Sequence, residues 1–185
     1  MGSWPQVAVP DDDTPLFINT TSFWCVGMSM KQMDATTGTA STTWVANLAI
    51  YIPFNLPWPY TVSRFFWING ATLTGPPNAQ VGIYGVDGVK IVASANTAQS
   101  GANAAQYAAA STVTRLSPGR YFLAYSNSGA VACSSCMAGV SVGPMAANQI
   151  FQQTSANPLP ANATFATATN ALLPFVGFTR TSSGF

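Results

Sequence analysis

The amino-acid sequence predicts an all-β protein: an antiparallel β-sandwich of jelly-roll type with an extended N-terminal arm. Two observations carry this prediction. Apolar segments of strand length recur from Phe23 onward between clusters of Gly, Pro, Asn and Asp, the residues that end strands. Helix signals are scarce: the one candidate, the alanine-rich residues 103–111, lacks an amphipathic stripe and runs into β-branched residues, so a strand is favoured there over a helix.

Residues 1–21 are expected to form the arm, and residues 22–185 the sandwich domain with long C-terminal loops. Prolines punctuate the arm, and its only charges are three consecutive aspartates. An arm of this composition rarely becomes ordered alone, so we expect a neighbouring subunit to hold it. The aspartates could ligate Ca²⁺, but an acidic patch that faces solvent or a partner is favoured. The candidate anchoring residues are Trp4, Asp11, Asp12 and Asp13.

The expected strands follow one another between turn signals. A polar run, a proline-rich segment and then Asn-Gly, Asp-Gly and Ser-Pro-Gly turns separate them. Residues 141–173 show no periodicity and are expected to form loops that wrap the sandwich. The expected strands are residues 23–30, 42–54, 60–68, 79–86, 89–94, 112–116, 120–126 and 174–180.

Asp87-Gly88 is the clearest hairpin signal, because this dipeptide supplies the positive φ values of a two-residue turn. Pairing outward from the turn sets Tyr84 opposite Ile91 and Gly82 opposite Ala93. Both faces of this ribbon are apolar, whereas a sheet with one face in water alternates apolar with polar residues. We therefore expect neighbouring subunits to cover the second face.

Charged side chains make up only 6% of the 185 residues, against roughly 25% in ordinary soluble domains. This predicts a surface either of neutral polar residues or largely covered by other chains. The net charge of +1 comes from scattered basic residues, which argues against nucleic-acid binding. No apolar run reaches about 18 residues, which argues against membrane insertion. The first residues show no secretory signal, so action in the cytoplasm or exit by another route is expected.

Catalytic chemistry has few residues to use. The chain contains no His and no Glu, which removes Ser-His-Asp and Cys-His pairs, and its five Asp residues do not form a paired-carboxylate pattern. Cys133 and Cys136 match C-x-x-C, but zinc needs two further ligands and only Cys25 remains. Buried free thiols are favoured, with a disulfide to Cys25 as the alternative. We expect no enzyme activity, no cofactor and no metal.

Aromatic side chains are the best binding candidates. Trp58 and Tyr60 lie beside two prolines in a loop that leads to Trp67. A flat exposed ring can stack on a sugar, and loops on a rigid sheet are where binding sites usually lie. The alternative is that these rings pack in the core or between subunits, as most dense aromatics do, and this alternative is favoured.

Four segments resemble those of small jelly-roll or β-sandwich structural proteins in the virions of tailed bacteriophages, which occur in tail fibres, receptor-binding assemblies and head decorations. The segments are AIYIPFNLPWPYTVSRFFW, NAQVGIYGVDGVKIVAS, LSPGRYFLAYS and LLPFVGFTR. The resemblance covers residues 42–123 and the last dozen, about half of the chain. It implies a non-enzymatic protein, commonly trimeric, that is assembled in the host cytoplasm, and it carries no catalytic residue across.

The expected function is that of a multi-copy virion structural protein whose apolar sandwich faces pack against identical subunits or other virion proteins. Sparse charge, two-faced apolar strands and the N-terminal arm favour this class. A module that binds carbohydrate or a host receptor, such as a host glycan, through Trp58, Tyr60 or Trp67 is the alternative.

Overall fold

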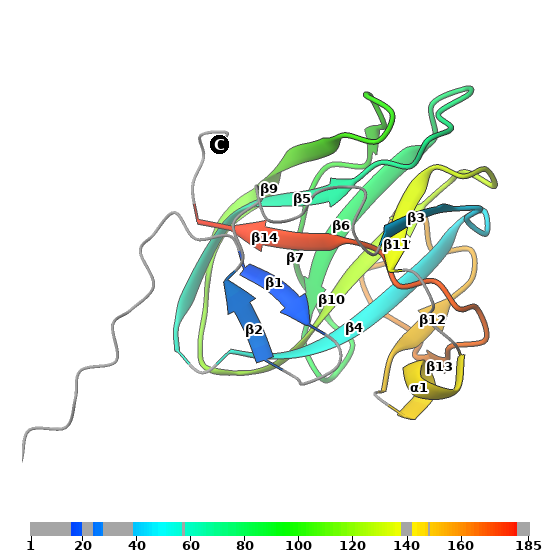
Figure 1. Cartoon of the computed structure of the whole chain (residues 1–185). Coiled ribbons are helices and arrows are strands. Elements are labelled where there is room, and N and C mark those ends of the chain that lie inside the picture. The colour runs from blue at the N-terminus through cyan, green and yellow to red at the C-terminus, as the bar shows by residue number, and fades with distance from the viewer. Residues whose placement is uncertain are drawn as a thin grey trace, which may run out of the picture.

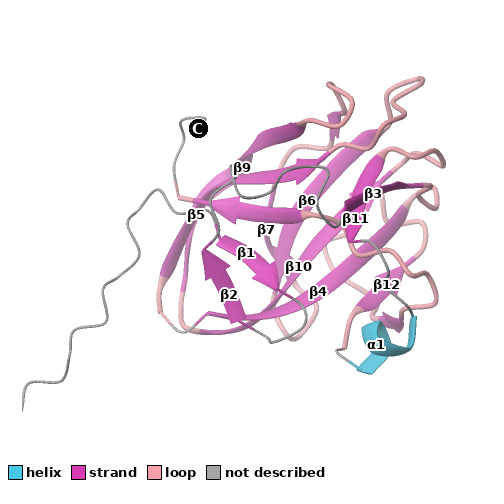
Figure 2. Cartoon of the chain, in the orientation of Figure 1, coloured by secondary structure: helices cyan, strands magenta, loops and turns pink. Residues whose placement is uncertain are grey.

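A computed structural model describes residues 16–19, 24–27, 39–56, 58–137, 142–147 and 149–180. The all-β prediction is confirmed: two antiparallel sheets pack into a sandwich, and the described residues contain one short helix (Figure 1 and Figure 2). The elements are β1 (Leu16–Asn19), β2 (Trp24–Gly27), β3 (Thr39–Thr42), β4 (Leu48–Leu56), β5 (Tyr60–Ile68), β6 (Asn78–Tyr84), β7 (Lys90–Ala93), β8 (Thr97–Ala98), β9 (Ala105–Leu116), β10 (Gly119–Asn127), β11 (Ser134–Met137), α1 (Val142–Ala147), β12 (Phe151–Gln153), β13 (Ala166–Thr167) and β14 (Val176–Thr179).

The sandwich consists of a five-stranded sheet in the order β2-β1-β14-β5-β9 and a seven-stranded sheet in which β13-β12-β4-β10-β6-β7 are neighbours and β8 pairs with β6. Strands β3 and β11 form a separate small sheet. The last strand, β14, lies between β1 and β5, so the two ends of the described chain meet in one sheet (Figure 1).

The expected arm reaches into this sheet. Leu16–Asn19, which the sequence placed in the arm, forms β1, and Leu16 pairs with Phe178 and Phe17 with Gly177. The boundary at residue 21 is therefore too late, because an apolar Leu-Phe-Ile segment finds a partner strand at the opposite end of the chain. The anchoring candidates Trp4, Asp11, Asp12 and Asp13 lie outside the described residues.

The main core fills the space between the two large sheets. Phe65 and Trp67 on β5 and Phe178 on β14 point into it with no exposed surface, because alternate residues of a strand face one side of the sheet. The facing sheet contributes Phe54 and Tyr125, and Phe54 lies 5.4 Å from Phe178 between ring centroids. This core holds the strands that carry the candidate sites in place.

The β6–β7 hairpin differs from its prediction at the turn. The pair Gly82–Ala93 is confirmed, but Tyr84 lies opposite Lys90 and not Ile91. The Gly88 N–H donates to the Gly85 carbonyl at 3.0 Å, and Gly88 has φ 81°. The loop therefore has three residues, a turn followed by a left-handed glycine, and the extra residue shifts the register at the tip.

The second face of the seven-stranded sheet is covered by the chain itself. Residues 154–165, here called the strap, connect β12 to β13 and cross this face. Tyr51, Tyr84 and Phe122 of the sheet form a second buried cluster with Ala156 and Leu159 of the strap, and Ala163 and Phe165 pack against it. The expectation that neighbouring subunits cover this face is therefore wrong.

Hydrogen bonds hold the strap in place. The Tyr84 hydroxyl donates to the Pro160 carbonyl at 2.6 Å, and Lys90 Nζ donates to the Leu159 carbonyl at 2.8 Å. The Leu159 N–H donates to Gln80 Oε1 at 2.7 Å. Lys90, the one charged residue of strands β6 and β7, thus binds the strap that covers the sheet.

Strand β9 (Ala105–Leu116) takes in most of the alanine-rich residues 103–111 and the expected strand 112–116, so the favoured interpretation as a strand is confirmed from Ala105 onward. Besides β1, six short elements were not expected: β3 and β11, which pair with each other, β8, and α1, β12 and β13 in the region predicted as loops. Each is too short to show a periodic pattern.

Candidate functional site

The three aromatic candidates, Trp58, Tyr60 and Trp67, differ in how deeply their side chains are buried. Trp67 has no exposed surface, and its Nε1 donates to Asn69 Oδ1 at 2.8 Å. Tyr60 is 5% exposed and meets Phe178 edge-on, with ring centroids 5.4 Å apart. Both are core residues, so they cannot form a sugar platform. Trp58, in the loop between β4 and β5, is half-buried and retains accessible surface.

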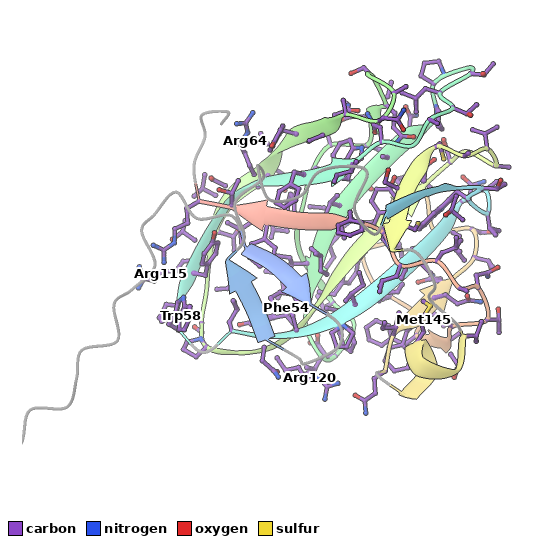
Figure 3. The ribbon with its side chains drawn as sticks, viewed as in Figure 1. Phe54, Trp58, Arg64, Arg115, Arg120 and Met145 are labelled. Atoms are coloured by element: carbon purple, nitrogen blue, oxygen red, sulfur yellow. The ribbon has the colours of Figure 1, made fainter. Side chains whose placement is uncertain are left out.

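Three arginines belong to the five-stranded sheet or directly follow it, and we call them the arginine group: Arg64 in the middle of β5, Arg115 near the end of β9 and Arg180 directly after β14. The guanidinium of Arg180 lies 4.7 Å from the Tyr60 ring centroid, and that of Arg64 lies 5.2 Å from the Tyr107 ring centroid. Arg115, on β9, pairs with Thr61 of β5. Figure 3 shows Arg64, Arg115 and Trp58 along one side of the molecule. Clustered cations over aromatic faces form a surface that attracts anionic groups.

Charge is divided unevenly along the chain. Of the six basic residues, five lie within residues 39–180, where Asp87 is the one acidic residue. The other four aspartates precede residue 39. The sandwich is therefore a basic body, although the whole chain is almost neutral.

A buried polar network lies at the opposite end from the hairpin tip. Asn127 Nδ2 donates to Gln99 Oε1 at 2.8 Å and to the Tyr125 hydroxyl at 3.0 Å, and Gln99 Nε2 donates to Asn69 Oδ1 at 2.7 Å. The hydroxyls of Tyr125 and Ser134 are 2.6 Å apart. Burial raises the pKa of Tyr125 above its usual range. Amides and neutral hydroxyls that satisfy one another fix loops but supply no general base. Sequence reasoning missed this network, because isolated Asn and Gln carry no pattern.

Cys133 and Cys136 are buried free thiols, as favoured from the sequence, and the side chain of Cys25 lies outside the described residues. Burial raises the pKa of Cys136 to about 12 and also raises that of Cys133. Because the thiolate is the reactive form, these thiols are poor nucleophiles and ligands. Within the described residues no group of His, Cys, Asp and Glu is placed to hold a metal ion, and no helix has the length and apolarity to cross a membrane.

Exposed apolar side chains gather along one edge of the sandwich. Among the described residues five large apolar side chains are exposed, and four of them form what we call the apolar rim: Val86 (62%), Val89 (46%), Ile91 (41%) and Val113 (66%). The fifth, Val45, precedes β4 at the opposite end of the sheet, since Leu48 pairs with Asn127 whereas the hairpin tip lies beyond Tyr84 and Phe122.

The geometry of β9 brings the rim together. Its pairing with β5 shifts between Thr114 and Ala109, so residues 110–113 bulge away from β5. Ala110 there forms an antiparallel bridge with Ser94, next to β7. If this register is continued by three residues toward the hairpin tip, Val113 of β9 is level with Ile91 of β7. Val86 lies in the turn after β6, and Val89 lies directly before β7.

No family model, no curated protein and no solved structure matches the chain.

Proposed function

We propose that the chain is a non-enzymatic structural subunit of a virion, of the kind found in tailed bacteriophages, and that its copies associate through the apolar rim. The observation that carries the proposal is that, among the described residues, four of the five exposed large apolar side chains lie on the β6–β7 hairpin and on the β9 bulge beside β7. Exposed apolar residues that are grouped, and not scattered, are typical of protein interfaces.

The four side chains of the rim are themselves apolar and uncharged, as the centres of interfaces usually are. The segments that carry them are not free of charge, since residues 84–94 and 109–115 contain Asp87, Lys90 and Arg115. The proposed interface is therefore the apolar rim and not the second face of the seven-stranded sheet, because the strap already covers that face.

The class of particle rests on the resemblance of four segments to phage β-sandwich proteins and on the absence of a catalytic constellation among the described residues. A trimer is the assembly state that this resemblance favours, and other virion proteins are the further partners. Glycan binding ranks second, because only Trp58 of its three predicted rings has accessible surface.

Charge placed on the rim should prevent association. In the double variant Val86→Lys/Val113→Lys, two side chains that are 62% and 66% exposed in the single chain become cationic. Burial of each valine is worth about 1.5 kcal/mol or more, so self-association should weaken by roughly 100-fold or more. Sedimentation velocity of the wild-type chain and the variant measures the change.

Val45→Lys is the matched control, because Val45 is 40% exposed but lies away from the rim. It should sediment as the wild-type assembly does. A wild-type chain that stays monomeric at micromolar concentration, or an equal loss of association in the control, would rule the proposal out.

A further inference from the structure

We propose that opposite charges set how two copies of the chain meet at the apolar rim: Asp87, in the β6–β7 turn of one copy, pairs with Arg115, on β9 of its neighbour. The proposal rests on the association proposed above and adds the orientation of the two chains in it. It is carried by the positions of these two residues beside the rim and by the contacts that the other basic residues make.

Asp87 lies on the hairpin side of the rim. It is exposed in the turn between Val86 and Val89, two residues of the rim. Its Oδ1 accepts from the Val89 N–H at 3.1 Å, which holds the carboxylate beside the valines. Because Asp87 is the one acidic residue within residues 39–180, this turn carries the negative charge of that part of the chain.

Arg115 lies on the β9 side of the rim, beside Val113. The two residues are two positions apart on β9, and alternate residues of a strand point to the same side of the sheet. Burial follows this alternation, because Val113 and Arg115 are exposed, whereas Thr114 is half-buried and Leu116 is buried. The guanidinium is therefore next to the most exposed side chain of the rim.

Arg115 is the basic residue that is available to a neighbour. Its guanidinium makes no hydrogen bond, ion pair or ring contact within the described part of the chain, whereas the other four basic residues of residues 39–180 contact groups of their own chain. These contacts join Arg64 to the Tyr107 ring, Lys90 to the Leu159 carbonyl, Arg120 to Gln149 and Arg180 to the Tyr60 ring. One guanidinium and one carboxylate beside the same apolar surface are thus left to pair between chains.

The two charges favour one arrangement of copies that pack rim against rim. If the hairpin of one copy met the hairpin of the next, two carboxylates would come together. If the hairpin meets the β9 bulge, each carboxylate comes beside a guanidinium, and like charges are kept apart. The guanidinium can bind Oδ2 of Asp87 while Oδ1 stays on the Val89 N–H. The valines of the hairpin then face Val113 of the neighbour.

Reversal and exchange of the two charges in the full chain test the proposal. Asp87→Arg and Arg115→Asp each place like charges opposite one another in the contact, and each should weaken self-association by about 10-fold or more. The double variant Asp87→Arg/Arg115→Asp restores opposite charges in every contact, whatever the number of copies, and should regain most of the wild-type affinity. Sedimentation velocity over a range of concentrations measures the affinities, and circular dichroism shows that each variant is folded.

The double variant also separates the effect of charge from damage to the turn. Asp87→Arg removes the acceptor of the Val89 N–H, and a substitution on β9 cannot replace that acceptor. Recovery of association in the double variant can therefore come only from the exchanged charges.

Arg120→Asp is the matched control, because it changes the net charge as Arg115→Asp does but lies on β10, opposite Asn55 of β4 and outside the rim. It should leave the association of the wild-type chain unchanged, and it should not restore the association of Asp87→Arg.

A monomeric wild-type chain would overturn the association itself, and this arrangement with it. If the wild-type chain associates, three results would each overturn the arrangement alone: a single charge reversal without effect, a double variant as weak as the single ones, or an equal loss in the Arg120→Asp control.

Discussion

Replacing Trp67 by alanine is expected to lower the free energy of unfolding by about 3–5 kcal/mol. The ring is fully buried at the centre of the main core, so its removal leaves a cavity that the sheets cannot close. The lost Nε1–H also removes a donor to Asn69 Oδ1, although Gln99 continues to donate to that oxygen. Urea unfolding at neutral pH measures the difference.

Trp58→Ala is the control for this variant. Trp58 is half-buried in a loop, so its truncation should cost less than about 1.5 kcal/mol. A similar loss of stability in both variants would contradict the assignment of Trp67 to the core and of Trp58 to the surface. If Trp58→Ala also abolished retention on a glycan column at unchanged stability, the second-ranked function would replace the first.

Leu159→Ala should cost about 2–5 kcal/mol, as large a loss as a core substitution, although Leu159 belongs to an irregular segment. The side chain is 3% exposed, and its Cδ1 lies 3.1 Å from the position that a Cβ on Gly82 would occupy. Truncation therefore opens the second cluster beneath the strap. The midpoint and slope of urea unfolding report the change.

Thr164→Ala is the matched control in the same strap. The Thr164 side chain is exposed. Its hydrogen bond to Gln153 Oε1, at 2.9 Å, comes from the backbone N–H, so the substitution leaves this bond in place. The control should stay within about 0.5 kcal/mol of the wild type. A Leu159→Ala variant as stable as this control would show that the packing of the strap on the sheet adds little to the free energy of unfolding.

The regular strands could be predicted from the sequence because their signals are local. The Asp87-Gly88 turn, and the apolar segments of strand length that end at turn residues in β5 and β6, identify strands without knowledge of their partners. The prediction of a two-residue turn was wrong, because the turn starts at Gly85 and Gly88 follows it in the left-handed conformation. A dipeptide shows that the chain turns, but not how many residues the turn contains.

The cover of the second face could not be predicted, since the strap has no periodicity and its contacts join residues far apart in sequence. Leu159, for example, bonds Gln80 through its N–H. Two-faced apolar strands therefore indicated correctly that something covers the sheet, but not that the cover belongs to the same chain. The apolar rim was missed for a related reason, because only the β9 bulge and the Ser94–Ala110 bridge bring β9 beside β7, and neither has a signal in the sequence.

Each chain completes its own core, and the association of chains follows folding. This is tested by thermal unfolding of Val86→Lys/Val113→Lys at concentrations from micromolar to nanomolar. We expect one cooperative transition whose midpoint does not change with concentration, because no partner contributes to the folded state. A midpoint that falls steadily on dilution would show instead that neighbouring chains complete the fold.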